Sequence, residues 1–127
     1  MKLKNLLLVL SVLLCLPSMA LAGGILDGKT FSGSMGNKGQ AANNQDDIVL
    51  QNGKFNSVLC NRFGYGAADY TATAQGDAIN FKAQTTNAKG GQMNWEGTVK
   101  GDTLKATNVT VENGQTSESW FKGTLKK

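Results

Sequence analysis

Histidine is absent from this 127-residue chain, and proline and cysteine are nearly absent. Without histidine the chain lacks the commonest general base and metal ligand of proteins. Its only proline is Pro17, whereas all 16 glycines follow residue 22. Proline cannot donate to a sheet's hydrogen-bond ladder, so a proline-free segment with glycines at its turns favours a continuous β-sheet.

Catalytic constellations are also missing. Cys60 has no histidine to activate it as a nucleophile. The carboxylates fall at expected turns, in loops or on outward positions, as Asp102 does beside Gly101. Asn43–Asp47 offers oxygen ligands but lacks the alternating spacing and final carboxylate of a calcium loop. We therefore expect no catalytic residue, no metal site and no cofactor, and hence a protein that is not an enzyme.

The charge balance is weak and evenly spread. The chain has 13 Lys and Arg against 9 Asp and Glu, and removal of Lys2 and Lys4 with an N-terminal leader leaves an excess of two positive charges. Nucleic-acid binding requires a basic stripe, and the positive residues form no run. This pattern argues against a nucleic-acid partner.

The first 22 residues predict a cleaved secretory signal peptide. A basic start, Met1–Lys4, precedes an apolar stretch, Leu6–Leu16, and Ala20–Ala22 is a small-x-small cleavage site. This signal helix is too short for a membrane span, which needs about 20 apolar residues. We expect a periplasmic or secreted protein with one domain, residues 23–127, and no membrane span after cleavage.

Removal of the signal would leave Cys60 as the only thiol. A lone cysteine in an exported protein cannot form an internal disulfide. Two alternatives stay open: a small buried hydrophobic residue, or a thiol that is reactive or paired with another chain.

The rest of the chain alternates apolar and polar residues between turn dipeptides. In Met93–Val111 the alternation flanks Gly101-Asp102, and the other dipeptides are Asn52-Gly53, Gly76-Asp77 and Asn113-Gly114. Three longer loops are expected at residues 33–47, 60–67 and 87–91. The expected strands are 29–34, 47–51, 54–59, 68–75, 78–86, 92–100, 103–111 and 115–125.

The turns fix the strand registers, and these place one set of apolar residues on a single face. Large residues oppose small ones, as Phe81 opposes Ala72 and Gly97, and Trp95 opposes Ala83. Agreement between turn chemistry and apolar pattern supports the registers. The shared face collects Ile48, Leu50, Phe55, Leu59, Tyr70, Ile79, Phe81, Met93, Trp95, Val99, Leu104, Phe121 and Leu125.

Eight strands joined in sequence, mostly by two-residue turns, predict an all-β, antiparallel up-and-down barrel. A β-sandwich is the alternative, although it needs longer crossovers between its sheets. The expected build is similar to that of avidins and small lipocalins, the calycin type of barrel. The chain carries none of their sequence motifs, and a shared build carries no function.

Successive connections of such a barrel alternate between its ends, so the three longer loops would form one mouth. Arg62, Phe63 and Tyr65 on the middle loop are candidate contacts for a ligand. The alternative is that the two aromatics fold inward as a lid. Inward-facing Tyr70, Trp95 and Asn108 are candidate pocket residues, with a filled core as the alternative.

The outer wall offers a third candidate. The register of the last turn places Trp120 opposite Thr107, with Val109 and Val111 on the same outward face. Exposed apolar clusters mark interfaces, so this face predicts a protein partner or a homodimer. The alternative is that Ile25-Leu26 covers it.

Two functions therefore stay open. The first is an exported small-molecule binder with an amphipathic ligand in its interior or at its long-loop end. The second is a protein-interaction module, such as an inhibitor or envelope-associated factor, that uses residues 61–65 or the Trp120 face.

Overall fold

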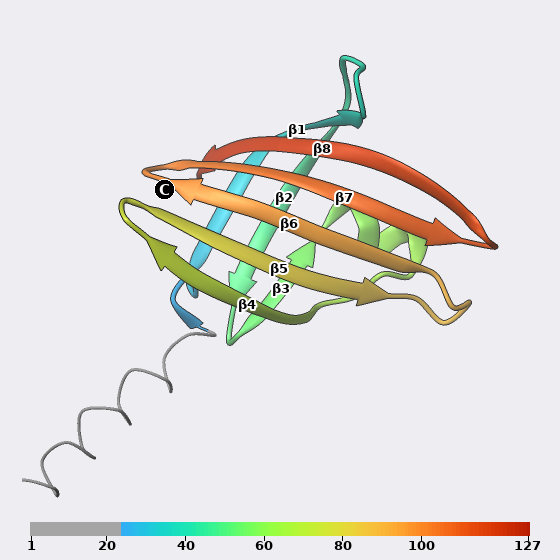
Figure 1. Ribbon diagram of the computed structural model, residues 1–127, viewed down its shortest axis with the longest axis horizontal. Helices are drawn as coiled ribbons and strands as arrows, with labels where there is room; N and C mark the ends of the chain where they lie inside the picture. The colour runs from blue at the N-terminus through green and yellow to red at the C-terminus, as the bar shows by residue number, and fades with distance from the viewer. Residues whose placement is uncertain (1–23) are drawn as a thin grey trace, which may run out of the picture.

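The computed structural model describes residues 24–127 and shows a closed barrel of eight antiparallel strands (Figure 1). Each strand pairs with its neighbours in sequence, and β8 pairs back onto β1. The predicted signal helix and its cleavage site lie outside the described residues. The strands are β1 (Lys29–Asn37), β2 (Ala42–Gln51), β3 (Lys54–Ser57), β4 (Ala68–Gln75), β5 (Ala78–Thr86), β6 (Gln92–Lys100), β7 (Thr103–Glu112) and β8 (Gln115–Leu125).

The four tight turns adopt the conformations that their residues favour. Asn52 and Asn113 have φ of 53° and 51°, and the glycine after each also has positive φ, which is the type I′ pattern. Gly76 and Gly101 have positive φ at the first turn position, which suits type II′. The predicted cross-strand pairs are confirmed, including Leu50 with Phe55 and Trp95 with Asn108.

The predicted apolar face is the inside of the barrel. Ten of its thirteen members are buried, and Leu59, Ile79 and Leu125 pack partly buried against them. Phe55 lies in the middle, with its ring centroid 5.9 Å from that of Phe81 and 5.1 Å from that of Trp95. The centre of the barrel is therefore filled by aromatic side chains.

The predicted long loop at residues 33–47 is wrong. β1 continues to Asn37 and β2 begins at Ala42, so the connection is only four residues long. The segment is polar because Ala42–Gln45 extend past the core and are exposed. Backbone pairing holds this end instead, since β1 forms ladders with both β2 and β8. The resulting hairpin stands out from the barrel at the top of Figure 1.

The other two longer connections occur as expected, at the right of Figure 1. β3 ends at Ser57 rather than Leu59, because residues 59–63 turn into a short 3₁₀ helix, η2 (Leu59–Phe63). β3 and β4 share only two residue pairs, and the connection between them buries Cys60 and Tyr65. This connection thus completes the core where the two strands separate.

Glycines allow the barrel to close at the seam between β1 and β8. Gly33 and Gly123 are direct cross-strand partners. A Cβ atom on Gly33 would overlap the carbonyl oxygen of Lys122 and the Cα of Gly123, both of which belong to backbone. A Cβ on Gly123 would lie 2.8 Å from the carbonyl oxygen of Ser32. The two strands approach each other closely here because neither residue has a side chain.

We expect Gly33→Ala to lower the free energy of unfolding by about 3 kcal/mol, the upper end of ordinary overpacking costs, because backbone cannot yield as a side chain can. Gly66→Ala is the matched control, since nothing lies within 4 Å of its added Cβ. Urea denaturation of both variants measures the difference. Equal midpoints for the two variants would contradict the role of the seam.

Candidate functional site

Tyr70 fastens the N-terminal lead-in to the tight-turn end of the barrel. Its hydroxyl donates to Asp27 Oδ1 at 2.7 Å and accepts from the Leu26 backbone N–H at 3.0 Å. Asp27 also accepts from the backbone N–H of Gly53 in the β2–β3 turn. Leu26 is fully buried, so it belongs to the core and lies away from Trp120. Tyr70, a predicted ligand contact, therefore has its hydroxyl engaged within the chain.

Trp95 and Asn108 face each other inside the barrel on β6 and β7. Both are buried, and Asn108 donates to Thr110 Oγ1 at 3.0 Å. Within residues 24–127, Trp95 Nε1, Asn108 Oδ1 and Thr85 Oγ1 are buried without a hydrogen-bond partner. The interior thus becomes polar toward the long-loop end, beyond the aromatic centre.

Tyr65 points inward from the β3–β4 connection and is 2% exposed. Its hydroxyl donates to Glu112 Oε2 at 2.7 Å, and a Cβ on Gly91 would overlap that hydroxyl. The structure therefore separates Tyr65 from its neighbours Arg62 and Phe63, which are exposed. Of the two aromatics on this loop, Tyr65 packs as a lid and Phe63 does not.

The two tyrosines of the chain both have raised pKa values. Burial, with Glu112 nearby, raises the pKa of Tyr65 to about 12, and burial, with Asp27 nearby, raises the pKa of Tyr70 to about 12. An unfolded tyrosine ionises near pH 10. The folded state therefore loses stability as pH rises from about 10 through 12.

We expect the tyrosinate absorbance of the folded protein to stay flat near pH 10 and to rise only near pH 12, whereas the urea-denatured protein titrates near pH 10. Ultraviolet difference spectra at both conditions measure this. Tyr70→Phe should halve the alkaline step, since the chain has two tyrosines. A folded protein with a step at pH 10 would show that the hydroxyls are solvated.

Arg62 and Phe63 line a pocket of 500 Å³ at the long-loop end, together with Lys89 and Glu112. Phe63 is 60% exposed, the highest value among the large hydrophobic residues of the described chain. Asn87 shapes the pocket, because its Oδ1 accepts from the Gly91 N–H at 2.7 Å and its Nδ2 donates to the Phe63 carbonyl at 3.4 Å. We call this the loop-end pocket.

Cys60, Ser57 and Asp46 form a buried cluster at the start of η2. Ser57 Oγ donates to Asp46 Oδ2 at 2.5 Å, and the backbone N–H of Leu59 donates to Asp46 Oδ1 at 2.9 Å. Burial raises the pKa of the Cys60 thiol, which disfavours the nucleophilic thiolate. Asp46 therefore anchors the start of η2, and Cys60 is a free, buried core residue.

Desolvation raises the pKa of the Asp46 carboxyl despite its hydrogen bonds. An acid whose folded pKa is raised destabilises the fold when ionised, so the protein gains stability as pH falls through the folded pKa. Asp46→Asn keeps an acceptor for the Leu59 N–H and a donor for Ser57, and it removes the charge.

We expect the stability of the Asp46→Asn variant, measured relative to the original protein, to be greater at pH 7 than at pH 4, because ionisation of the buried carboxyl destabilises the original protein at the higher pH. Urea denaturation of both proteins across this range measures the gap. A gap that is independent of pH would show that Asp46 ionises as readily in the fold as in the unfolded chain.

A depression on the outer wall of β4 to β8 has a volume of 710 Å³. We call it the outer groove. Its outward side chains form two cross-strand rows, which the strand registers align. The first row is Thr73, Asn80, Thr98, Lys105 and Lys122, and the second is Thr71, Lys82, Glu96, Thr107 and Trp120.

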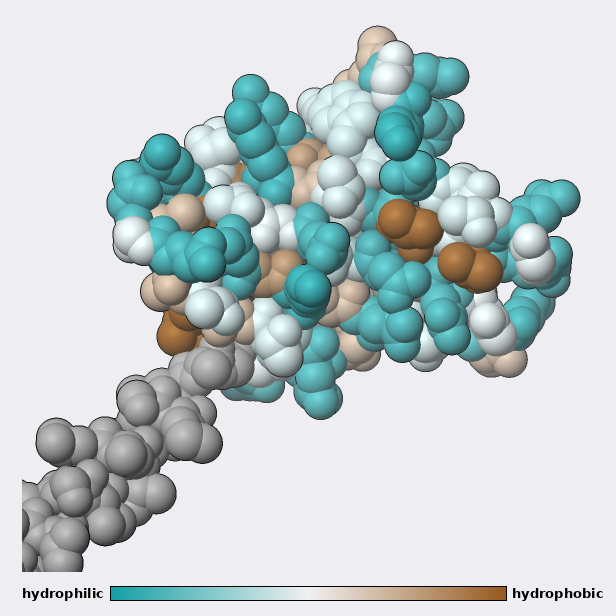
Figure 2. Space-filling model, viewed as in Figure 1, coloured by the Kyte–Doolittle hydropathy of each residue, from teal (hydrophilic) through white to brown (hydrophobic). Residues whose placement is uncertain are grey.

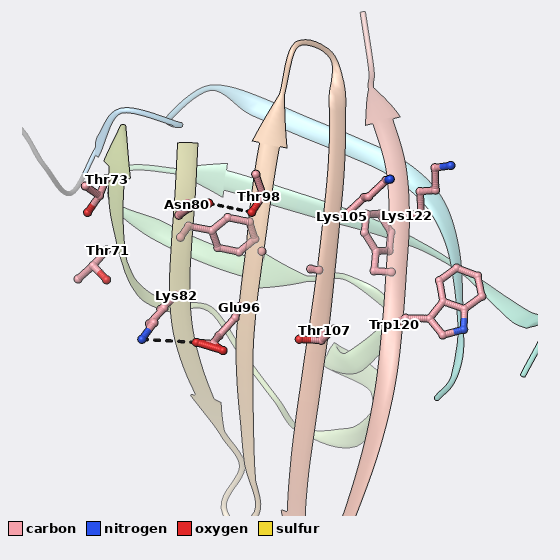
Figure 3. A pocket seen from close by; sticks show the side chains of 14 residues that line it. Thr71, Thr73, Asn80, Lys82, Glu96, Thr98, Lys105, Thr107, Trp120 and Lys122 are labelled. Carbon is pink, nitrogen blue, oxygen red and sulfur yellow. Dashed lines mark hydrogen bonds and ion pairs between the residues drawn. The ribbon is translucent and has the colours of Figure 1, made fainter. Parts of the chain in front are cut away.

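Hydrogen bonds and one ion pair hold the middle of the outer groove. Thr98 Oγ1 donates to Asn80 Oδ1 at 2.8 Å, and Lys82 Nζ lies 3.4 Å from Glu96 Oε1. Figure 3 shows Thr71 and Thr73 on one side and Trp120, Lys122 and Lys105 on the other. Residues at the alternate positions of the same strands also line the groove, namely Phe81, Gly97, Ala106 and Phe121. The groove thus presents hydroxyl, amide and charged groups around a central space.

Trp120 forms one wall of the groove, and the β1–β2 hairpin braces its side chain. Its Nε1 donates to the carbonyl of Gln40 at 3.0 Å, on the β1–β2 turn. Gly36 is its cross-strand partner, and a Cβ there would lie 2.9 Å from Nε1. The hairpin that sequence reasoning missed thus fixes the indole. The residue is half-buried, covered by this hairpin rather than by Ile25-Leu26.

The residues of the predicted partner face do not form one patch, because Trp120 lines the outer groove and the two valines do not. Val109 and Val111 point outward on β7 and are half-buried, and they lie opposite Glu118 and Thr116 of β8. Neither valine lines the outer groove. Figure 2 shows a largely hydrophilic surface with small, separate hydrophobic patches on the visible face. Trp120 therefore belongs with the polar groove rather than with an apolar patch.

Sequence reasoning missed the outer groove because it followed the apolar positions. The signal was present in the alternate residues, since Thr71 and Thr73, or Glu96 and Thr98, are successive outward positions of one strand. A curved wall was needed to turn these rows into a depression.

The described residues contain no cluster of histidine, cysteine, aspartate or glutamate suited to a metal ion. Within the same residues, no helix has the length and apolarity to cross a membrane. No protein-family model, curated protein or solved structure matches the chain, so its function has to be inferred from the geometry of its side chains.

Proposed function

We propose that the protein is an exported, non-enzymatic binding module that holds an extended carbohydrate chain in its outer groove. The supporting observation is the braced indole of Trp120 beside two rows of hydroxyl, amide and charged side chains. Aromatic rings offer an apolar face to sugar C–H groups, and the polar rows match ring hydroxyls. A groove open along the wall suits a chain longer than one sugar.

The proposal places the ligand outside the barrel. The side chains of Phe55, Phe81 and Trp95 fill the centre of the barrel, so this part of the interior is occupied by the protein itself. Tyr65 and Tyr70 have their hydroxyls bound to Glu112 and Asp27. The hypothesis of an interior ligand thus has less support than a site on the wall.

Several features support a binding role without catalysis. The chain has no histidine, and its one thiol in the described residues is buried with a raised pKa. Glu96, a groove carboxylate, is held by Lys82 and is 63% exposed, which is a poor setting for acid catalysis. The leader-like residues 1–22 support export to the periplasm or beyond.

The loop-end pocket supports a second candidate, a protein-interaction surface. Its specific observation is Phe63, which stays 60% exposed although Asn87 holds its backbone carbonyl. A fixed, exposed aromatic beside Arg62 resembles the centre of a protein-binding hot spot.

One experiment compares the outer groove with the loop-end pocket as the site of carbohydrate binding. Affinity electrophoresis in native gels that contain soluble neutral or acidic polysaccharides measures retardation of the protein. We expect Trp120→Ala to reduce retardation at least tenfold in apparent affinity, and Phe63→Ala, the matched exposed aromatic, to leave it unchanged. Loss with Phe63→Ala alone would move the site to the loop end, and no retardation on any polysaccharide would reject the proposal.

A further inference from the structure

Positive charge is left over after the internal ion pairs are formed. Between residues 24 and 127, six of the nine carboxylates form ion pairs with six of the eleven Lys and Arg side chains. The other three carboxylates, Asp27, Asp46 and Glu112, accept hydrogen bonds from neutral groups. The described cations outside these pairs are Lys29, Arg62, Lys89, Lys105 and Lys122.

Two of these cations lie directly opposite each other in the outer groove. Lys105 on β7 pairs with Lys122 on β8, and the next partners in the row are Thr98 and Ser34, both neutral. Like charges at directly opposed positions destabilise a sheet. In the neighbouring row the opposed charges have opposite signs, since Lys82 lies opposite Glu96 and forms an ion pair with it. Within the described residues neither lysine forms an ion pair, so no paired carboxylate balances the repulsion between the two positive charges.

We propose that Lys105 and Lys122 bind the carboxylates of an acidic polysaccharide, such as a polyuronate, in the outer groove. This inference rests on the proposed carbohydrate-binding function and specifies its ligand. A carboxylate between the two ammonium groups replaces their repulsion with two charge-assisted hydrogen bonds. Trp120 lies two residues from Lys122 on the same strand and on the same wall, so a sugar ring contacts the indole while its carboxylate meets the lysines (Figure 3).

The groove favours a sparsely charged glycan over other anionic polymers. Duplex nucleic acid carries a charge about every 1.7 Å and needs a basic stripe. Glu96, in contrast, lies in this groove beside the only other lysine that lines it. A peptide that binds by adding a strand needs a sheet edge, and a closed barrel has none. Acidic motifs are otherwise recognised by clusters of arginine, and no arginine lines this groove. A flat lipid surface does not enter a depression of this shape.

The test uses isothermal titration calorimetry with oligogalacturonate, a carboxylated oligosaccharide, and with a neutral xylo-oligosaccharide as comparison. The double variant Lys105→Gln/Lys122→Gln removes the pair. Lys29→Gln/Lys100→Gln is the control with the same change in net charge, because both of its lysines lie outside the outer groove and the loop-end pocket. We expect the groove variant to bind oligogalacturonate at least tenfold more weakly, and the control to bind as the original protein does. Added NaCl should weaken the original interaction.

A second measurement separates binding from folding. Because the like-charge pair is unfavourable in the free protein, the groove variant should melt at a higher temperature than the original, whereas the control should not. Weaker binding together with higher thermal stability supports a ligand site. A lower melting temperature for the groove variant would overturn the inference, because it would give the lysines a structural role.

The failures of the two proposals are distinguishable. Equal binding of both oligosaccharides, lost on Trp120→Ala and kept in the lysine variant, would overturn the acidic ligand but keep the carbohydrate site. Equal losses in both lysine variants would show attraction by net charge alone and overturn the inference. Duplex DNA bound as tightly as oligogalacturonate would also overturn it. Insensitivity of all binding to Trp120→Ala would reject the proposed function itself.

Discussion

The close approach of β1 and β8 at Gly33 and Gly123 is the constraint on which the rest of the structure depends. A hydrogen-bonded seam between the first and last strands removes both edges of the sheet and encloses the apolar face on all sides. Any side chain at Gly33 would meet backbone, which cannot move aside without breaking the ladder. The aromatic centre, the buried lead-in and the curvature of the outer wall all follow from this closure.

Closure also decides where binding can occur. A barrel of eight strands has room for side chains or for one small ligand, and here Phe55, Phe81 and Trp95 take the middle. Without an edge, the backbone offers no strand for a partner to extend. The proposed recognition therefore falls to outward side chains, and these gather where rows from five strands meet on one wall.

The ligand proposed for the outer groove would set binding against stability. Most surface charges are paired across strands or turns, as Lys82 is with Glu96. Lys105 and Lys122 depart from that pattern in the row beside Trp120. Functional sites are where proteins tolerate locally unfavourable arrangements, and this departure beside Trp120 is the reason for the proposed anion site.

The sequence by itself determined the strands from Lys54 onward except for the end of β3, and it determined their registers and the inward face. Short-range rules suffice there, because Asn-Gly and Gly-Asp turns fix the pairing and alternation then assigns each side chain to a face. It did not determine the hairpin of β1 and β2, whose tip is polar and held by ladders on both sides. The sequence also grouped Tyr65 with Phe63, although the first is buried as a lid and the second is exposed. Only the tertiary structure decided these points and assembled the outer groove, because strand curvature and contacts between distant segments, such as Trp120 with Gln40, leave no local pattern.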